Sequence, residues 1–203
     1  AWHALLNVRF GSSQSPEADL REARNHLDVI LRRRPDDGMS RALEGLMLLL
    51  ENDWERSVEA GLEATRLLPG SADVWAVLAH SYTFAGEPDR ALEAIDRAME
   101  LSPGHPDFYN WIKGRALRLS GSHEPAIQLL ERDLETGGNA IVQLVELAAA
   151  YAAIDRVGDA RRIGRLVRQI EPNFTASEWV LHPSMSSHDM QSIEFELLSK
   201  AGL

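Results

Sequence analysis

The sequence contains no cysteine. This absence excludes disulfide bonds and thiolate metal sites, and it fits a protein that works in a reducing compartment. Prolines are few, at 9 of 203 residues. The long stretches between them are rich in alanine and leucine, which favour helix. The sequence therefore predicts a helical, cytoplasmic protein.

No apolar run is long enough to cross a bilayer. The longest, from Ile141 to Ile154, is interrupted by Gln143 and Glu146, and a membrane-spanning helix needs about 20 apolar residues. No signal peptide is recognisable. The chain opens at Ala1 without a methionine, which indicates a processed protein or a piece of a longer one. We expect no contact with a membrane.

Basic residues are the minority among the charges. The chain has 21 Lys and Arg against 31 Asp and Glu, a formal net charge of −10. Nucleic-acid binding requires a concentrated basic face, so we expect no nucleic-acid partner. Two local groups of arginine, at 32–34 and between 156 and 168, are interpreted as solvated helix ends and faces, and the first complements a helix C-terminal dipole.

Catalytic signatures are missing as well. The sequence has neither a phosphate-binding Gly-x-x-x-x-Gly-Lys loop nor a Gly-x-Ser-x-Gly elbow. His182 and His188 are six residues apart rather than at the i, i+4 spacing of a zinc-binding helix. No spacing pairs a nucleophile with a base. We therefore predict no catalytic residue, no metal site and no cofactor.

A repeat is revealed by the spacing of prolines. Pro35, Pro69 and Pro103 recur every 34 residues, and Pro172 lies close to two further periods on. A period of 34 is the length of a tetratricopeptide repeat, which is a helix–turn–helix unit.

The clearest unit spans residues 72–105. Its first helix is expected to carry one packing face at i, i+3, i+4 and i+7, with a glycine in the turn. Small alanines should let the second helix approach the first, and a proline ends the unit. These residues are Trp75, Leu78, Ala79, Tyr82, Gly86, Ala91, Ala98 and Pro103.

Similar units precede and follow it. Residues 38–71, 107–140 and 141–174 repeat the pattern with local departures, such as Arg41, Glu44 and Ser57. Residues 1–37 form an irregular first unit, as terminal repeats often do. The chain resembles the tetratricopeptide repeat family, which implies an all-α superhelix of about five helix–turn–helix units. Residues 175–203 leave the period and are predicted to cap the last unit with a helix from about Ser187 to Lys200.

The last hundred residues resemble a more particular family, the bacterial class III nucleotide cyclases with a C-terminal tetratricopeptide region. The similarity lies in Pro106–Tyr109, Gly114–Arg115, Leu147–Tyr151, Pro172–Phe174 with Trp179, His182–Pro183 and Lys200–Leu203. The resemblance implies a catalytic domain upstream that this chain does not contain. It implies that these repeats regulate that domain or recruit partners.

The tetratricopeptide resemblance also implies a concave wall formed by the first helix of each unit. Carried onto this chain, its inward positions give an apolar wall with a polar, basic centre. That composition suits an amphipathic helix or extended segment bearing an acidic group. The predicted partner-binding residues are His80, Thr83, Phe84, Phe108, Trp111, Arg115 and Arg118.

Three other interpretations of this group stay open. Phe108 and Trp111 are aromatics at helical spacing, which are usually core. Arg115 and Arg118 are equally consistent with solvated or locally paired arginines. The tail helix of the chain itself could instead fill the groove.

The sequence therefore predicts a non-catalytic scaffold that binds a protein or peptide segment, or its own catalytic domain. The leading interpretation places it at the C-terminus of a nucleotide-cyclase-like signalling protein. The alternatives are a free-standing adaptor and the repeat region of a bacterial transcriptional activator with an upstream DNA-binding domain.

Overall fold

The computed structural model describes residues 15–136, 141–181 and 185–203. Within them all regular structure is helical, which confirms the predicted all-α class. The helices are α2 (Pro16–Arg33), α3 (Gly38–Leu50), α4 (Trp54–Leu67), α5 (Ala72–Ala85), α6 (Pro88–Leu101), α7 (Phe108–Leu119), α8 (His123–Glu135), α9 (Ile141–Ala153), α10 (Val157–Ile170), α11 (Ala176–Trp179) and α12 (His188–Lys200). Residues 1–14 of the irregular first unit lie outside the described residues.

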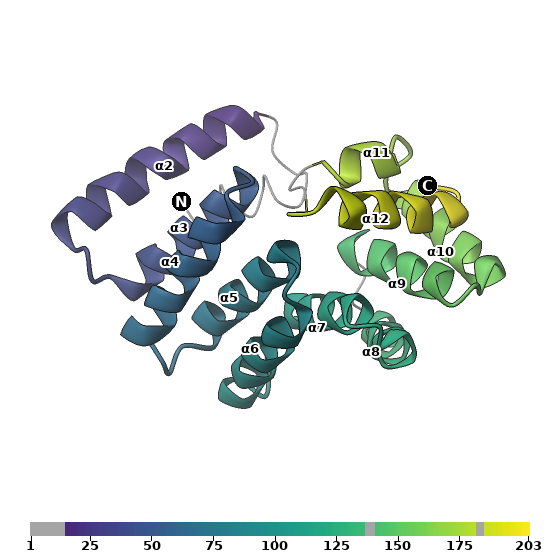
Figure 1. The fold of residues 1–203 in the computed structure, drawn as a ribbon, viewed down its shortest axis with the longest axis horizontal. Coiled ribbons are helices and arrows are strands. Elements are labelled where there is room, and N and C mark those ends of the chain that lie inside the picture. Colours follow the sequence, from purple (N-terminus) through teal and green to yellow (C-terminus); the bar gives the residue numbers. More distant parts are fainter. Residues whose placement is uncertain (1–14, 137–140, 182–184) are drawn as a thin grey trace.

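The helix pairs follow one another along an arc, as Figure 1 shows. Each first helix packs on its own second helix, and each second helix packs on the next first helix. The first helices α3, α5, α7 and α9 also contact one another in succession, so they form the inner layer of the superhelix. The chain is thus a solenoid in which each unit mainly touches its neighbours.

The turn inside each unit requires a left-handed backbone at the same position. The four residues there are Asn52, Gly86, Gly121 and Asp155, with φ of 60°, 80°, 83° and 57°. Glycine takes this conformation without a steric penalty, and Asn and Asp tolerate it better than other residues. The units at 38–71 and 141–174 therefore keep the turn although they lack the glycine.

The unit at 38–71 departs from the pattern without losing its contacts. Arg41 stands where the next unit has Trp75. The Arg41 Nε atom donates to the Pro35 carbonyl at 3.1 Å, just as Trp75 Nε1 donates to the Pro69 carbonyl at 2.9 Å. These bonds connect α3 and α5 to the proline turns that precede them.

Small and polar side chains fill the close helix contacts. Ser57 is fully buried and bonds the Gly45 carbonyl at 2.8 Å and the Ser81 hydroxyl at 2.7 Å, which links α3, α4 and α5. A Cβ atom added to Gly61 would lie 2.9 Å from Leu78 Cδ1, so the absence of a side chain there allows α4 to approach α5. The described helices include none long and apolar enough to span a bilayer.

Candidate protein-binding surface

The residues predicted to line the inner wall all lie on α5 and α7, and all but one of them are buried. His80, Thr83 and Phe84 on α5, and Trp111, Arg115 and Arg118 on α7, are all buried. Phe108 lies at the start of α7, is partly exposed and packs its ring 4.8 Å from that of Tyr109. The inner wall is therefore closed rather than free.

The C-terminal segment is what covers this wall. Figure 1 shows α12 lying along the inner side of the arc, beside α9. The Ser186 amide donates to the Phe84 carbonyl at 3.0 Å, and Met185 is buried in the same apolar cluster as Phe84. At the far end of the tail, Arg168 of α10 donates from Nε to the Gly202 carbonyl at 2.9 Å.

Two arginines and two glutamates form a buried charge cluster between the wall and the tail. Arg118 donates to Glu146 of α9 at 2.8 Å and to Glu194 of α12 at 2.6 Å. Arg115 also donates to Glu146 and lies 3.5 Å from Glu194. All four side chains are at most 3% exposed. Arg115 and Arg118 are therefore locally paired in the structure, and they are not solvated.

The contacts within the cluster favour the charged forms of Glu146 and Arg118. Burial opposes the charged form of Glu146, but the guanidinium groups of Arg118 and Arg115 outweigh it and lower the pKa of that carboxyl. Burial likewise opposes the charge on Arg118, and the two carboxylates raise its pKa in spite of it. The four groups together carry no net charge, which is the condition for burying them.

Aromatic rings surround the cluster. The Arg115 guanidinium lies 4.4 Å from the centre of the Phe84 ring. The His80 ring meets Phe84 edge-on at 5.1 Å and lies 4.9 Å from Trp111. Trp111 is 1% exposed, so the interpretation of this tryptophan as core is the one the structure supports.

Sequence reasoning missed the two glutamates of the cluster. Glu146 is the one charged residue of α9, in the segment IVQLVELAAAYAA. A lone carboxylate in an otherwise apolar helix signals a buried partner, because an unpaired buried charge is costly. Glu194 gives no such signal, since it stands among other polar residues of α12.

A cavity of about 430 Å³ separates part of α12 from the repeats. Its apolar lining comes from Leu119 at the end of α7, Ala153 at the end of α9, and Met190, Ile193 and Leu197 of α12. Arg118, Glu194 and His123 supply its polar side. Burial, and then the charge of Arg118, lower the pKa of His123, so this ring is neutral at pH 7. The cavity itself shows that α12 covers this part of the wall incompletely.

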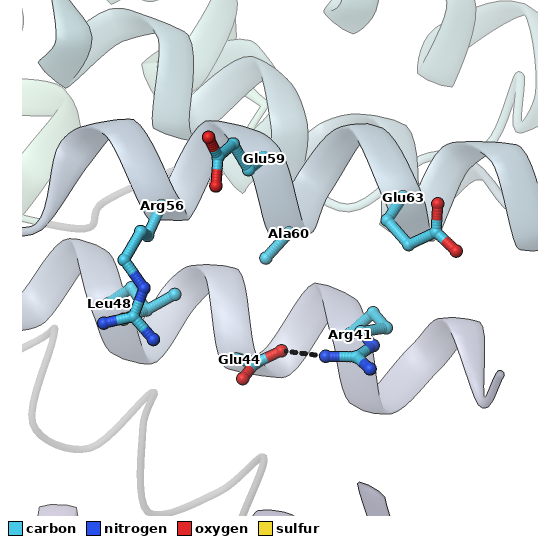
Figure 2. Close-up of a pocket in the computed structure, with 7 residues that line it drawn as sticks. All are labelled: Arg41, Glu44, Leu48, Arg56, Glu59, Ala60 and Glu63. Atoms are coloured by element: carbon cyan, nitrogen blue, oxygen red, sulfur yellow. Dashed lines mark hydrogen bonds and ion pairs between the residues drawn. The ribbon is translucent and has the colours of Figure 1, made fainter. Parts of the chain in front are cut away.

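A smaller notch lies between α3 and α4, shown in Figure 2. Its volume is about 230 Å³, and its lining consists of Arg41, Glu44, Leu48, Arg56, Glu59, Ala60 and Glu63. The Arg41 and Glu44 side chains pair with each other at 2.8 Å. The charges in the notch are of mixed sign and half in solvent, as on an ordinary helical surface.

The part of the chain that the structure describes contains no group of three or more metal-ligating side chains. His188 starts α12, and His182 lies outside the described residues. The predictions of no metal, no cofactor and no catalytic residue stay predictions.

Two family models, both of the tetratricopeptide repeat, match residues 17–72 and 72–112. Residues 17–112 are therefore similar to tetratricopeptide repeats. The matched segments include the irregular second helix of the first unit and the clearest unit of the sequence.

Solved structures share the fold over 86–100% of this chain. PilW, described as a widely conserved type IV pilus biogenesis factor, is 16% identical with a TM-score of 0.70, over 100% of this chain and 90% of that one. YrrB, a tetratricopeptide protein with an unusual peptide-binding site, is 15% identical with a TM-score of 0.55 over 86% and 90%. MamA from Desulfovibrio magneticus RS-1 is 14% identical with a TM-score of 0.52 over 90% and 94%. At these identities the similarity shows the fold alone.

Proposed function

We propose that this chain is a non-catalytic scaffold that binds a helical segment of a partner protein on its inner wall. One observation carries the proposal: the wall already holds a helical segment, α12, through buried apolar and charged contacts. A surface that binds one amphipathic helix has the shape and chemistry to bind another. YrrB, which shares the fold, is described as having an unusual peptide-binding site, and this description supports the proposal.

The setting of the scaffold is a second part of the proposal. The resemblance of residues 106–203 to the C-terminal region of class III nucleotide cyclases favours a cytoplasmic signalling protein whose catalytic domain lies upstream. A free-standing adaptor accounts equally well for the fold. The gene sequence upstream of Ala1 distinguishes them, because a cyclase domain supports the first setting and a start codon at the boundary supports the second.

The binding function is tested with the purified full chain. Proteins captured from the source cell are identified, and each is purified and titrated against the chain by calorimetry. We expect one partner to bind with a saturable isotherm, and we expect no turnover of ATP or GTP by the chain. The absence of any saturable partner, or nucleotide turnover by the pure chain, would contradict the proposal.

Two matched variants locate the binding surface. Phe108 is the predicted wall residue that is partly exposed, and Arg161 is exposed on the outer helix α10. We expect Phe108→Glu to weaken binding of the partner by about tenfold, because it places a charge in an apolar contact. Arg161→Glu should leave the affinity unchanged. Equal affinities of both variants and the unaltered chain would place the partner elsewhere on the molecule.

A further inference from the structure

The inner wall needs a carboxylate that the repeats do not supply. Arg115 and Arg118 come from α7 and Glu146 from α9, so the repeats alone place two positive charges and one negative charge in this wall. Glu194 of α12 supplies the missing negative charge, at 2.6 Å from Arg118. An uncompensated charge buried in a protein is strongly unfavourable, so the wall favours any occupant that brings an acidic side chain.

The helix that brings it is held loosely. Only Glu194, Leu197 and Leu198 are buried in α12, whereas α9 buries eleven of its 13 residues. Ile193 and Phe195 are 56% and 46% exposed, and the cavity of about 430 Å³ lies beneath the same helix. A segment with few buried contacts opens at lower free energy than the core of the protein.

The fit of the charge cluster is also incomplete. Arg115 Nε is a buried donor and Glu194 Oε1 is a buried acceptor, and neither has a hydrogen-bond partner among the described residues. Buried polar atoms left unsatisfied cost free energy, and an occupant whose carboxylate accepts from Arg115 Nε would recover it. An acidic helix placed in this way would therefore make a hydrogen bond that α12 does not make.

Building on the proposed function, we propose that α12 is an exchangeable intramolecular ligand that blocks the inner wall. The partner that replaces it is an amphipathic helix whose acidic and apolar side chains follow the same spacing along the sequence as those of α12. It places a carboxylate at the position of Glu194 and apolar side chains three and four residues later, as Leu197 and Leu198 do in α12. The chain is then autoinhibited, and it becomes available when an acidic helix displaces the tail.

The experiment uses the full chain and a labelled synthetic peptide of residues 185–203. In the Glu194→Arg chain the cluster holds three positive charges and one negative charge, which should release the tail and free the wall. We expect this variant to bind the peptide at least about tenfold more tightly than the unaltered chain, whose wall is occupied. The same peptide carrying Glu194→Arg should not bind.

Glu196→Arg is the matched control. It makes the same change two residues along α12, where the side chain is 69% exposed and the residue pairs only with Lys200 at 3.4 Å. We expect the Glu196→Arg chain to bind the peptide as weakly as the unaltered chain does. A folded Glu194→Arg chain that fails to bind the peptide, or binds it no better than this control, would overturn the proposal.

Hydrogen exchange on the unaltered chain provides a test that depends on no variant. We expect the amides of α12 to exchange at least about tenfold faster than those of α7 and α9, because the tail opens while the repeats stay folded. Equal protection of α12 and α9 would show that α12 is a fixed part of the core. If the Glu194→Arg chain also fails to fold, the same conclusion follows, and both results would overturn the proposal. These measurements involve no cellular partner, so a fixed tail helix is distinguished from the absence of a partner, which the calorimetric titrations measure separately.

Discussion

Arg118 joins parts of the chain that are 28 and 76 residues away in sequence, through Glu146 and Glu194. Ion pairs on the surface of a protein contribute about 0–1 kcal/mol, because water screens both charges. This pair of contacts differs, since the Arg118 side chain is 3% exposed and water screens buried charges much less. Removing one member of such a cluster leaves the others charged and buried.

We therefore expect Arg118→Met to lower the free energy of unfolding by about 3–5 kcal/mol, the usual cost of stranding a buried carboxylate. Methionine keeps most of the apolar stem of arginine, so the loss reports on the charge. Arg162→Met is the matched control, because Arg162 is 51% exposed and lies 3.9 Å from Asp159, and its effect should stay below about 0.5 kcal/mol. Urea unfolding of the two variants measures both, and equal losses would show that the buried cluster contributes no more than a surface pair.

At the scale of elements, two glycines of α10 provide a test of how the tail is docked. Gly164 faces the Ala201 carbonyl so closely that an added Cβ atom would overlap it, whereas nothing lies within 4 Å of a Cβ atom at Gly158. Because the Ala201 oxygen belongs to the backbone, it cannot move aside as a flexible side chain would. The last turn of the tail therefore depends on the absence of a side chain at position 164.

We expect Gly164→Ala to destabilise the protein by about 1–3 kcal/mol, as overpacking does in a close contact. Gly158→Ala should be neutral or stabilising by up to about 1 kcal/mol, since alanine favours helix and meets no neighbour. Thermal unfolding of the two variants compares them directly. A Gly164→Ala protein as stable as Gly158→Ala would mean that the tail end does not pack on α10.

How far the sequence predicted these elements depends on the kind of signal each one carries. The paired helices follow from local chemistry, because proline and glycine mark their ends and a 3.6-residue period marks their faces. The tail helix was also predictable, from about Ser187 to Lys200, and is found at His188–Lys200. The place where this helix packs was not predictable. Two of its five large apolar residues, Ile193 and Phe195, are exposed, and the residue that fixes its position on the wall is the charged Glu194.

The same limit applies to the predicted wall. Spacing brought six of the seven named residues to one surface, since positions within a repeat fix the face on which a side chain lies. Spacing does not report what lies against that face. The closing segment is far along the chain and outside the repeat, so only the structure shows that it covers Arg115 and Arg118.

For the molecule as a whole, the three tyrosines provide one internal probe in each of three successive units. Tyr82, Tyr109 and Tyr151 are 3%, 0% and 1% exposed. Burial raises the pKa of all three, and it raises that of Tyr151 to about 12. Hydrogen bonds to acidic residues reinforce the shift at Tyr109, which donates to Asp73 at 2.8 Å, and at Tyr151, which donates to Glu131.

A phenol whose pKa is raised by folding stabilises the protein below its ordinary pKa of about 10, and this stability is lost as pH rises through the folded value. We therefore expect the tyrosinate absorbance at 295 nm to stay low near pH 10 while the helical circular dichroism is intact. Between about pH 10 and 12 the two signals should change together, because the phenols ionise as the units unfold. Tyrosinate forming near pH 10 with full helicity would mean that these side chains are open to solvent, and the packing faces of all three units would then be assigned wrongly.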